Sequence, residues 1–271
     1  MNSSGPQEPA VSTWAGELGE WLAMSGVGVV DRVVCEEEID STQDEARNAA
    51  GGTAGLVLAA GRQRRGRGRL GRVWADTGGM GLACTFVLDG GMDDARVSMV
   101  AGLAACMTAE GALESGVLGI DADRVGMRWP NDVVERAGLA GRKVAGVLVE
   151  RVDGLLYVGI GINVTHLLSD WDERLRHKAV SLRQLGASCD RLVVLRALIG
   201  AVDRAVKMDE AALLGAWRQR DVLVGRRQAF VHDNREYRGT VRGINPRGEI
   251  ELVTEDGVVG LPALTTSIVH E

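Results

Sequence analysis

The sequence predicts an α+β fold, in which a β-sheet with packed helices fills most of the chain and a small all-β module ends it. The first observation is that segments with helical apolar spacing are interspersed with short apolar or β-branched runs. The second is that, after about residue 221, short β runs alternate with turn sequences such as Asn-Pro-Arg-Gly. The third is the length of 271 residues, enough for one large domain and a small one. We expect a loose tail at 1–12, a main domain at 13–221 and a second domain at 222–271.

The first elements follow from local spacing and capping signals. Residues 14–24 carry apolar side chains at helical spacing, whereas 27–39 is rich in β-branched residues and predicts a strand. A hydroxyl residue followed three positions later by an acid opens 41–50, which is typical of a capped helix start. The apolar run 55–60 predicts a short buried strand, and a Gly/Arg loop follows at 61–73.

The second half of the main domain continues the mixture of strands and helices. We expect strands at 81–88, 126–129, 143–152 and 155–164, and a helix at 95–118. Residues 182–220 are expected to be mostly helical. The side chains expected on or near the buried face there are Val193, Leu195, Leu198, Val202 and Val206.

Composition excludes several classes of protein. Lys plus Arg is 31 and Asp plus Glu is 37, so the net charge of −6 disfavours a general nucleic-acid binder. Four cysteines occur without a CxxC pair and far from the histidines in sequence, which disfavours a zinc site or a disulfide framework. The start lacks the features of a signal peptide, and the most apolar stretch, 97–109, is too short to span a bilayer. We therefore expect a cytoplasmic protein with no membrane partner.

The most unusual segment is 61–72, which holds six arginines, four glycines and no acid, directly after a predicted strand. Glycines allow close approach of the backbone to a ligand, and guanidinium groups bind phosphate or carboxylate. The loop is therefore suited to a small anion such as a nucleotide phosphate. On charge alone, a solvated basic loop that touches RNA or DNA explains it equally well. Trp74, just beyond the loop, favours the nucleotide because an aromatic ring can stack on a purine.

Four further segments could carry chemistry, although each has an ordinary structural explanation. Arg128-Trp-Pro-Asn-Asp132 follows a predicted strand, but Pro-Asn-Asp is also a common turn. Lys143 begins an apolar strand, where a lysine either lies at the strand end or pairs with an anion, and Gly146 leaves space beside it. Gly159 and Gly161 interrupt a strand, which indicates close approach of a ligand or of other backbone. The hydroxyls of 40–43 could meet a polar ligand, but helix capping alone explains them.

The order of these segments resembles the biotin protein ligases. The motifs that carry the resemblance are Asp40-Ser-Thr-Gln43, Gln63, Gly66-Arg-Gly-Arg-Leu-Gly-Arg72 with Trp74, Trp129-Pro-Asn-Asp132, Lys143-Val-Ala-Gly-Val-Leu-Val-Glu150 and Gly161-Ile-Asn163. The resemblance covers about 38–165 and, more weakly, the terminal β module. It implies a mixed sheet followed by a small SH3-like β-barrel.

The resemblance also implies a reaction and its site. The enzyme would join biotin to ATP, with Mg²⁺, to form biotinyl-5′-adenylate, and would then pass biotin to a lysine of a biotin carboxyl carrier domain. The expected catalytic residues are Arg67, Lys143, Arg128 and Asp132. The residues expected to bind biotin are Ser41, Thr42, Gln43, Gln63, Arg67, Gly68, Arg69, Lys143 and Gly146. Those expected on the ATP or adenylate side are Arg69, Arg72, Trp74, Asn131, Asp132 and Asn163.

The chain departs from the family pattern at three places. Arg128 stands where the family usually has a lysine, and His270 stands near the end where the family usually has an arginine. Only 39 residues precede Asp40, so we expect a ligase without a winged helix and without specific DNA binding, acting as a monomer or homodimer. The alternatives are a lipoate- or octanoate-transferring relative, an RNA-binding protein that uses the arginine loop, and an inactive biotin-binding relative.

Overall fold

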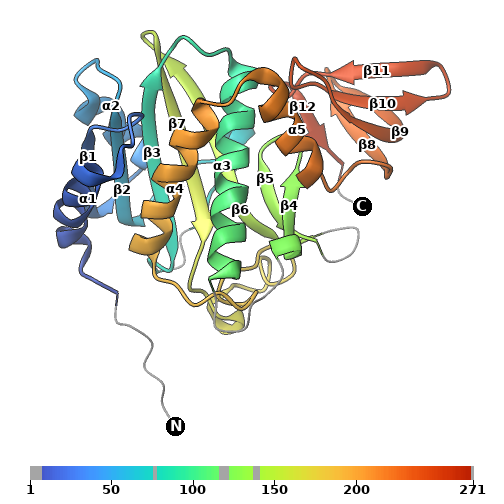
Figure 1. The fold of residues 1–271 in the computed structure, drawn as a ribbon. Coiled ribbons are helices and arrows are strands. Elements are labelled where there is room, and N and C mark those ends of the chain that lie inside the picture. The colour runs from blue at the N-terminus through green and yellow to red at the C-terminus, as the bar shows by residue number, and fades with distance from the viewer. Residues whose placement is uncertain (1–7, 76–77, 116–121, 137–140, 270–271) are drawn as a thin grey trace.

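Two β-sheets organise the chain in the computed structural model, which describes residues 8–75, 78–115, 122–136 and 141–269 (Figure 1). The larger sheet has seven strands in the order β1 (Arg32–Ile39), β2 (Leu56–Gln63), β3 (Gly81–Asp89), β7 (Leu155–Asn163), β6 (Lys143–Val152), β5 (Asp132–Glu135) and β4 (Val125–Arg128). The helices are α1 (Val11–Ser25), α2 (Thr42–Ala50), α3 (Asp94–Glu114), α4 (Arg191–Val206) and α5 (Glu210–Arg220).

The larger sheet is mixed, which confirms the predicted fold class. Strands β1 and β2 pair in parallel, and every other neighbouring pair is antiparallel. Figure 1 shows α3 and α4 side by side across one face of this sheet. Helix α2 packs on the opposite face, because alternate strand residues such as Leu58 and Val87 join Ala46 and Ala50 in a separate apolar cluster. The sheet is therefore covered on both faces, and the site described below lies beside α2.

The last 45 residues that the structure describes hold the second sheet, which confirms the predicted all-β module. Its five antiparallel strands are β8 (Arg227–His232), β9 (Arg235–Ile244), β10 (Ile250–Thr254), β11 (Gly257–Leu261) and β12 (Thr266–Ile268). Buried Phe230 and Leu252 belong to the same apolar cluster as the helices and the main sheet. The two sheets thus share a continuous core.

Several sequence-based expectations were wrong in detail. Strand β5 was missed, since four residues after a proline turn give no periodic signal, and pairing with β4 and β6 forms the strand. The segment expected to be helical at 182–220 contains two helices, α4 and α5, which Asp190 and Asp209 cap by accepting a backbone N–H bond. Val193, expected near the buried face, is 54% exposed.

The start of the chain, the strand boundaries and the capping of α2 also differ from expectation. Helix α1 begins at Val11, inside the segment expected to be loose, and Glu8 pairs with Arg191 at 2.9 Å. Strand β1 begins at Arg32 rather than at residue 27, and β2 continues to Gln63, so the loop expected at 61–73 begins only at residue 64. The Ser41 side chain makes no capping hydrogen bond at the start of α2. The expected end of the 95–118 helix and the departure at His270 lie outside the described residues.

Helix α3 is long and apolar enough to cross a membrane by length and composition alone. However, 67% of its most apolar window is buried inside the protein, where it contacts α4 and the main sheet. This burial is what a core helix shows.

Candidate functional site

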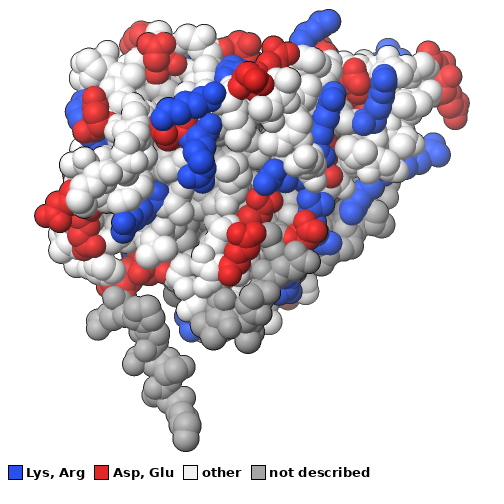
Figure 2. Space-filling view, in the orientation of Figure 1, with Lys and Arg blue, Asp and Glu red and all other residues white. Residues whose placement is uncertain are grey.

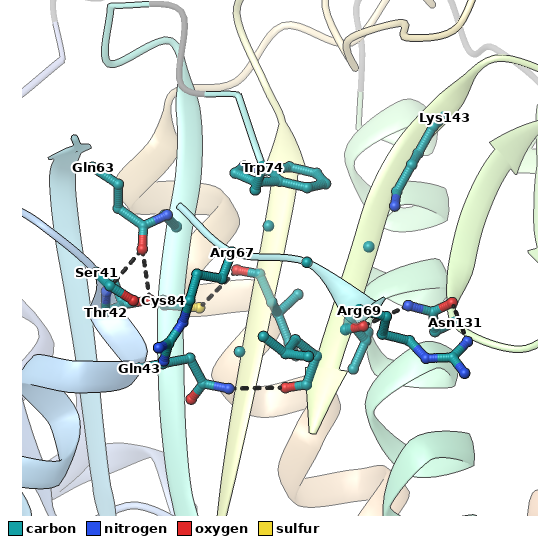
Figure 3. Close-up of a pocket in the computed structure, with 18 residues that line it drawn as sticks. Ser41, Thr42, Gln43, Gln63, Arg67, Arg69, Trp74, Cys84, Asn131 and Lys143 are labelled. Atoms are coloured by element: carbon teal, nitrogen blue, oxygen red, sulfur yellow. Dashed lines mark hydrogen bonds between the residues drawn. The ribbon is translucent and has the colours of Figure 1, made fainter. Parts of the chain in front are cut away.

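A pocket of about 470 Å³ gathers residues from six segments that are far apart in the sequence (Figure 3). The residues that the sequence analysis had named and that line it are Ser41, Thr42, Gln43, Gln63, Arg67, Gly68, Arg69, Trp74, Asn131, Lys143 and Gly146. Figure 3 shows the polar side chains from the start of α2 on one side of the pocket, Lys143 and Asn131 on the other, and Trp74 between them. The sheet places these groups together because β2, β3, β7 and β6 are consecutive neighbours.

The polar side of the pocket is a network of buried hydrogen bonds. Gln63 Oε1 accepts from the backbone N–H of Thr42 at 2.8 Å and from the Thr42 hydroxyl at 3.0 Å. The hydroxyl of Thr85 donates to that of Thr42 at 2.9 Å. These bonds engage the backbone N–H and the hydroxyl of Thr42, and they hold the start of α2 against the end of β2.

Gln43 presents an unsatisfied acceptor beside this network. Its amide nitrogen donates to the carbonyls of Leu148 at 3.2 Å and Tyr157 at 3.3 Å. Its Oε1 is buried and has no hydrogen-bond partner among the residues that the structure describes. Because buried polar atoms are normally paired, this oxygen could accept a hydrogen bond from an N–H group of a ligand.

Two glycines leave room on strands β6 and β7 for the side chains of Trp74 and Lys143. Gly146 and Gly161 are direct neighbours across the β6–β7 ladder. A Cβ at Gly161 would lie 2.5 Å from the Trp74 indole, and one at Gly146 would lie 2.5 Å from Lys143 Nζ. The close approach inferred for these glycines is thus made by two side chains of the site, and any side chain at either glycine would displace them.

Asp132 lies between two cations. Its Oδ1 is 2.7 Å from Lys143 Nζ, and its Oδ2 is 3.0 Å from Arg128 Nη2. Burial alone would raise the pKa of the Asp132 carboxyl, but Lys143 and Arg128 together hold that pKa below its ordinary value. Asp132 is therefore ionised at neutral pH and fixes Lys143, whose ammonium also lies 5.3 Å from the Trp74 ring centroid.

A second pocket, of about 680 Å³, adjoins the first, and the two share Gly68, Arg69, Trp74, Asn131 and Lys143. Of these two pockets, only the second is lined by Arg72, Arg128 and Asp132 and by residues 266–268 of the terminal module. Asn163 lines neither. Its amide nitrogen donates to the carbonyls of Lys143 at 2.9 Å and Val180 at 3.2 Å, which anchors the start of β6.

Arginines of the Gly/Arg loop form ion pairs with acidic side chains of neighbouring elements. Arg67 Nη2 lies 2.8 Å from Asp44 and 3.4 Å from Glu150, and Glu150 also pairs with Arg47 at 2.8 Å. Arg64 is likewise 2.8 Å from Asp40. Asp40 directly follows β1, Asp44 lies in α2 and Glu150 lies in β6, so the sequence of the loop alone gives no indication of them.

Arg69 reaches furthest from the loop. It donates to Asn131 Oδ1 at 3.3 Å, to the carbonyl of Leu264 at 3.4 Å and to the carbonyl of Ala263. Burial, opposed by nearby Asp132, lowers the pKa of this guanidinium, which still stays charged at neutral pH. One arginine thus links the loop, the Trp-Pro-Asn-Asp motif and the terminal module.

Sequence reasoning missed the apolar wall of the first pocket. The residues it did not assign to the site are Ala83, Cys84, Val147, Leu148, Gly159, Ile160 and Gly161, although both glycines had been noted as close-approach positions. Burial raises the pKa of the Cys84 thiol, which therefore stays protonated and forms part of the wall rather than a nucleophile. All four cysteines are free thiols.

Comparison with known proteins gives concordant matches. Residues 36–165 match the model of the biotin/lipoate A/B protein ligase family. The chain is 30% identical over 221 residues to biotin--[acetyl-CoA-carboxylase] ligase of Mycobacterium tuberculosis, covering 76% of this chain and 77% of that protein. It is 27% identical over 241 residues to the bifunctional ligase/repressor BirA of Bacillus spizizenii, covering 83% and 70%. Among solved structures, biotin protein ligase from Aquifex aeolicus in complex with biotin and ATP is similar with a TM-score of 0.74 and 27% identity, over 88% of this chain and 99% of that one.

Proposed function

The chain belongs to the biotin/lipoate A/B protein ligase family, and from this premise we propose that it is an ATP-dependent biotin–protein ligase. It activates biotin to biotinyl-5′-adenylate and transfers the biotinyl group to a lysine of a biotin carboxyl carrier domain. The observation that carries the proposal is the meeting of Gln63, Lys143 and the Gly/Arg loop in one pocket that adjoins a second one.

We assign biotin to the first pocket. The ureido ring of biotin offers two N–H donors and one carbonyl, and the pocket offers the unpaired Gln43 oxygen together with the hydroxyls of Ser41 and Thr42. The apolar part of biotin would lie against Val147 and Ile160. Gly68 would allow the ligand to approach the backbone closely, whereas the space beside Gly146 is taken by Lys143 and Trp74.

We assign the nucleotide to the second pocket. Arg72, Asn131 and Asp132 line it, and Trp74 stands between the two ligands. The proposed role of Asn163 changes from nucleotide contact to positioning, because its amide holds the backbone carbonyl of Lys143. The biotin carboxylate would then meet the α-phosphate near Lys143, which both pockets share.

The charges at this junction match the first half-reaction. A carboxylate oxygen attacks the α-phosphorus, a P–O bond to the leaving pyrophosphate breaks, and negative charge gathers on the phosphate oxygens. Fixed cations lower the barrier because they need no reorganisation as that charge develops. We propose that Lys143, Arg67 and Arg69 supply them, with Arg128 holding Asp132 so that Lys143 keeps its orientation.

In the second half-reaction the lysine amine attacks the biotinyl carbonyl, the bond to AMP breaks, and the amine proton is lost. The mixed anhydride hydrolyses if water reaches it, so we propose that the loop at 64–73 covers it. The loop is suited to such a movement because exposed ion pairs of the kind Arg67 makes with Asp44 are weak and exchangeable.

Magnesium is part of the proposal only as a companion of ATP. Among the described residues, no group of three or more His, Cys, Asp or Glu side chains could hold a metal ion. Both oxygens of Asp132 are engaged by Lys143 and Arg128. Bound to the phosphates and to water, Mg²⁺ would supply further positive charge at the reacting phosphate.

Biotin-dependent exchange between ATP and pyrophosphate tests the function. We expect exchange with biotin and none with lipoate or octanoate, and exchange with either of those acids alone would favour the related transferase. The RNA-binding alternative loses support because Arg64 and Arg67 of the loop are paired with acids. On the face that carries α3 and α4, basic and acidic side chains are also interspersed (Figure 2). We also propose that the protein acts in the cytoplasm, as a monomer or homodimer, without specific DNA binding.

A further inference from the structure

Trp129 of the Trp-Pro-Asn-Asp motif directs its side chain into the terminal module. Its ring packs edge-to-face on Phe230 of β8, with centroids 5.7 Å apart and an interplanar angle of 76°. Its indole Nε1 donates to the carbonyl of Gly248 at 2.9 Å. The side chain is 2% exposed, and Trp129 is also one of the residues that line the second pocket. A motif of the main domain thus holds the module by a buried ring and a buried hydrogen bond.

The turn that Trp129 holds also touches α3. A Cβ at Gly248, whose φ is +72°, would lie 3.0 Å from the Cβ of Ala95 at the start of α3. The turn at 245–249 is closed by Asn245, which accepts from the backbone N–H groups of Arg247 at 2.9 Å and Glu249 at 3.1 Å. This rigid turn is therefore clamped between Trp129 and α3, which fixes the position of the module relative to the sheet.

The module in turn contributes to the site at two places. The carbonyls of Ala263 and Leu264 accept hydrogen bonds from Arg69 of the loop. Residues 266–268, on β12, line the second pocket, whereas the first pocket is lined only by residues between 41 and 161. Strand β12 pairs with β8 through Ile268 and Phe230, and Phe230 is the residue on which Trp129 packs. A displacement at Trp129 would therefore pass through one strand pair to the wall of the second pocket.

We infer that Trp129 is a positioning residue that holds the terminal module in place as a wall of the nucleotide pocket and as the anchor of Arg69. The inference rests on the proposed function, which assigns the nucleotide to the second pocket and biotin to the first. It follows that loosening Trp129 weakens the use of ATP while leaving the use of biotin nearly unchanged.

Trp129→Phe tests this inference in the full-length protein, because it removes the bond to Gly248 and keeps an aromatic ring beside Phe230. Trp14→Phe is a matched control: Trp14 is also fully buried and also donates its Nε1–H to a carbonyl, that of Pro9 at 3.1 Å, but it lies in α1. Steady-state exchange is measured with ATP varied at saturating biotin and with biotin varied at saturating ATP. We expect Trp129→Phe to raise KM for ATP about fivefold, as for one lost hydrogen bond, with KM for biotin changed less than about twofold.

Hydrogen exchange of individual segments distinguishes a local loosening of the module from a general loss of stability. In Trp129→Phe the amides of 227–232 and of the loop at 64–73 should exchange faster, whereas in Trp14→Phe the change should be confined to α1 and its contacts. Phe230→Leu keeps the indole bond but removes the edge-to-face ring contact, and it should shift KM for ATP in the same direction by a smaller factor.

The outcomes separate this inference from the proposed function. Equal rises in both KM values, or a Trp129→Phe enzyme as active as the wild type at every ATP concentration, would overturn the positioning role. Equal effects of Trp14→Phe and Trp129→Phe on KM for ATP would do so as well. A wild-type protein that shows no biotin-dependent exchange would instead refute the proposed function.

Discussion

Replacing Lys143 with methionine removes a charge from the junction of the two pockets and keeps much of the aliphatic stem beside Gly146 and Trp74. The Lys143 ammonium is 2.7 Å from Asp132, and the side chain is 30% exposed. In the variant Asp132 retains Arg128 at 3.0 Å as its ionic partner. The carboxylate is therefore not left without a counter-charge, and we expect a loss of stability of only about 1–2 kcal/mol.

The effect on the reaction should be larger than the effect on folding. A cation about 4 Å from a phosphate charge contributes about 4 kcal/mol at an effective dielectric constant near 20. Asp132 shares the charge of Lys143, and solvent reaches the partly exposed side chain, so the net contribution is smaller. We expect a loss of about 10²-fold in adenylate formation, corresponding to about 2.7 kcal/mol.

Biotin-dependent ATP–pyrophosphate exchange measures this loss, and urea unfolding monitored in parallel measures the stability of the same variant. Lys207→Met is the matched control, since Lys207, directly after α4, pairs with buried Asp203 at 2.6 Å and its own side chain is 61% exposed. The control should exchange at the wild-type rate. Exchange by Lys143→Met within about twofold of wild type would remove Lys143 from the mechanism and refute the electrostatic reasoning.

Three further predictions concern the site, its loop and the domain junction. Arg128→Lys should keep kcat/KM for ATP within about threefold of wild type, because an ammonium can replace the bond to Asp132. Arg128→Ala should lower kcat/KM for ATP at least about tenfold, or about 1.4 kcal/mol. Equal rates in all three proteins would contradict this. ATP plus biotin should protect residues 61–74 from proteolysis more than ATP alone, and equal cleavage in both cases would argue against a covering loop. Burial raises the pKa of the Asp221 carboxyl to about 6, and its Oδ2 has no hydrogen-bond partner among the described residues. This group therefore favours folding below about pH 4, and the advantage is lost as pH rises through 6, so Asp221→Asn should raise the free energy of unfolding by roughly 2 kcal/mol at pH 7.5 and by less at pH 4.5. Urea unfolding at both pH values checks this. A gain in the free energy of unfolding at pH 7.5 that is no larger than the gain at pH 4.5, or a loss at pH 7.5, would contradict it.

Much of the main sheet and of the polar site could be predicted from the sequence. The strand patterns around Lys143 and Gly159 carry clear apolar runs, and the motif residues have functional groups that are rare at such positions. Strand β5 escaped because its four residues depend on pairing with two neighbours. The break between α4 and α5 escaped because apolar spacing continues on both sides of the Asp209 cap.

The remaining parts of the site leave no chemical signature in the sequence. Apolar wall residues such as Ile160 are indistinguishable from ordinary core residues. The partners of Arg69 in the module are backbone carbonyls, which every residue possesses. Trp129 was noted only as part of a motif, and its role depends on Phe230 and Gly248, about 100 residues further along the chain.

The transfer of biotin to a carrier domain tests the central claim most directly. The protein is incubated with ATP, Mg²⁺, biotin and an unmodified biotin carboxyl carrier domain, and peptide mass spectrometry locates any biotinylated lysine. We expect modification of a single lysine of the carrier, dependent on ATP and strongly reduced in Lys143→Met. A carrier left unmodified by a folded, biotin-binding protein, or one modified equally well without ATP, would contradict the assignment as an ATP-dependent biotin–protein ligase.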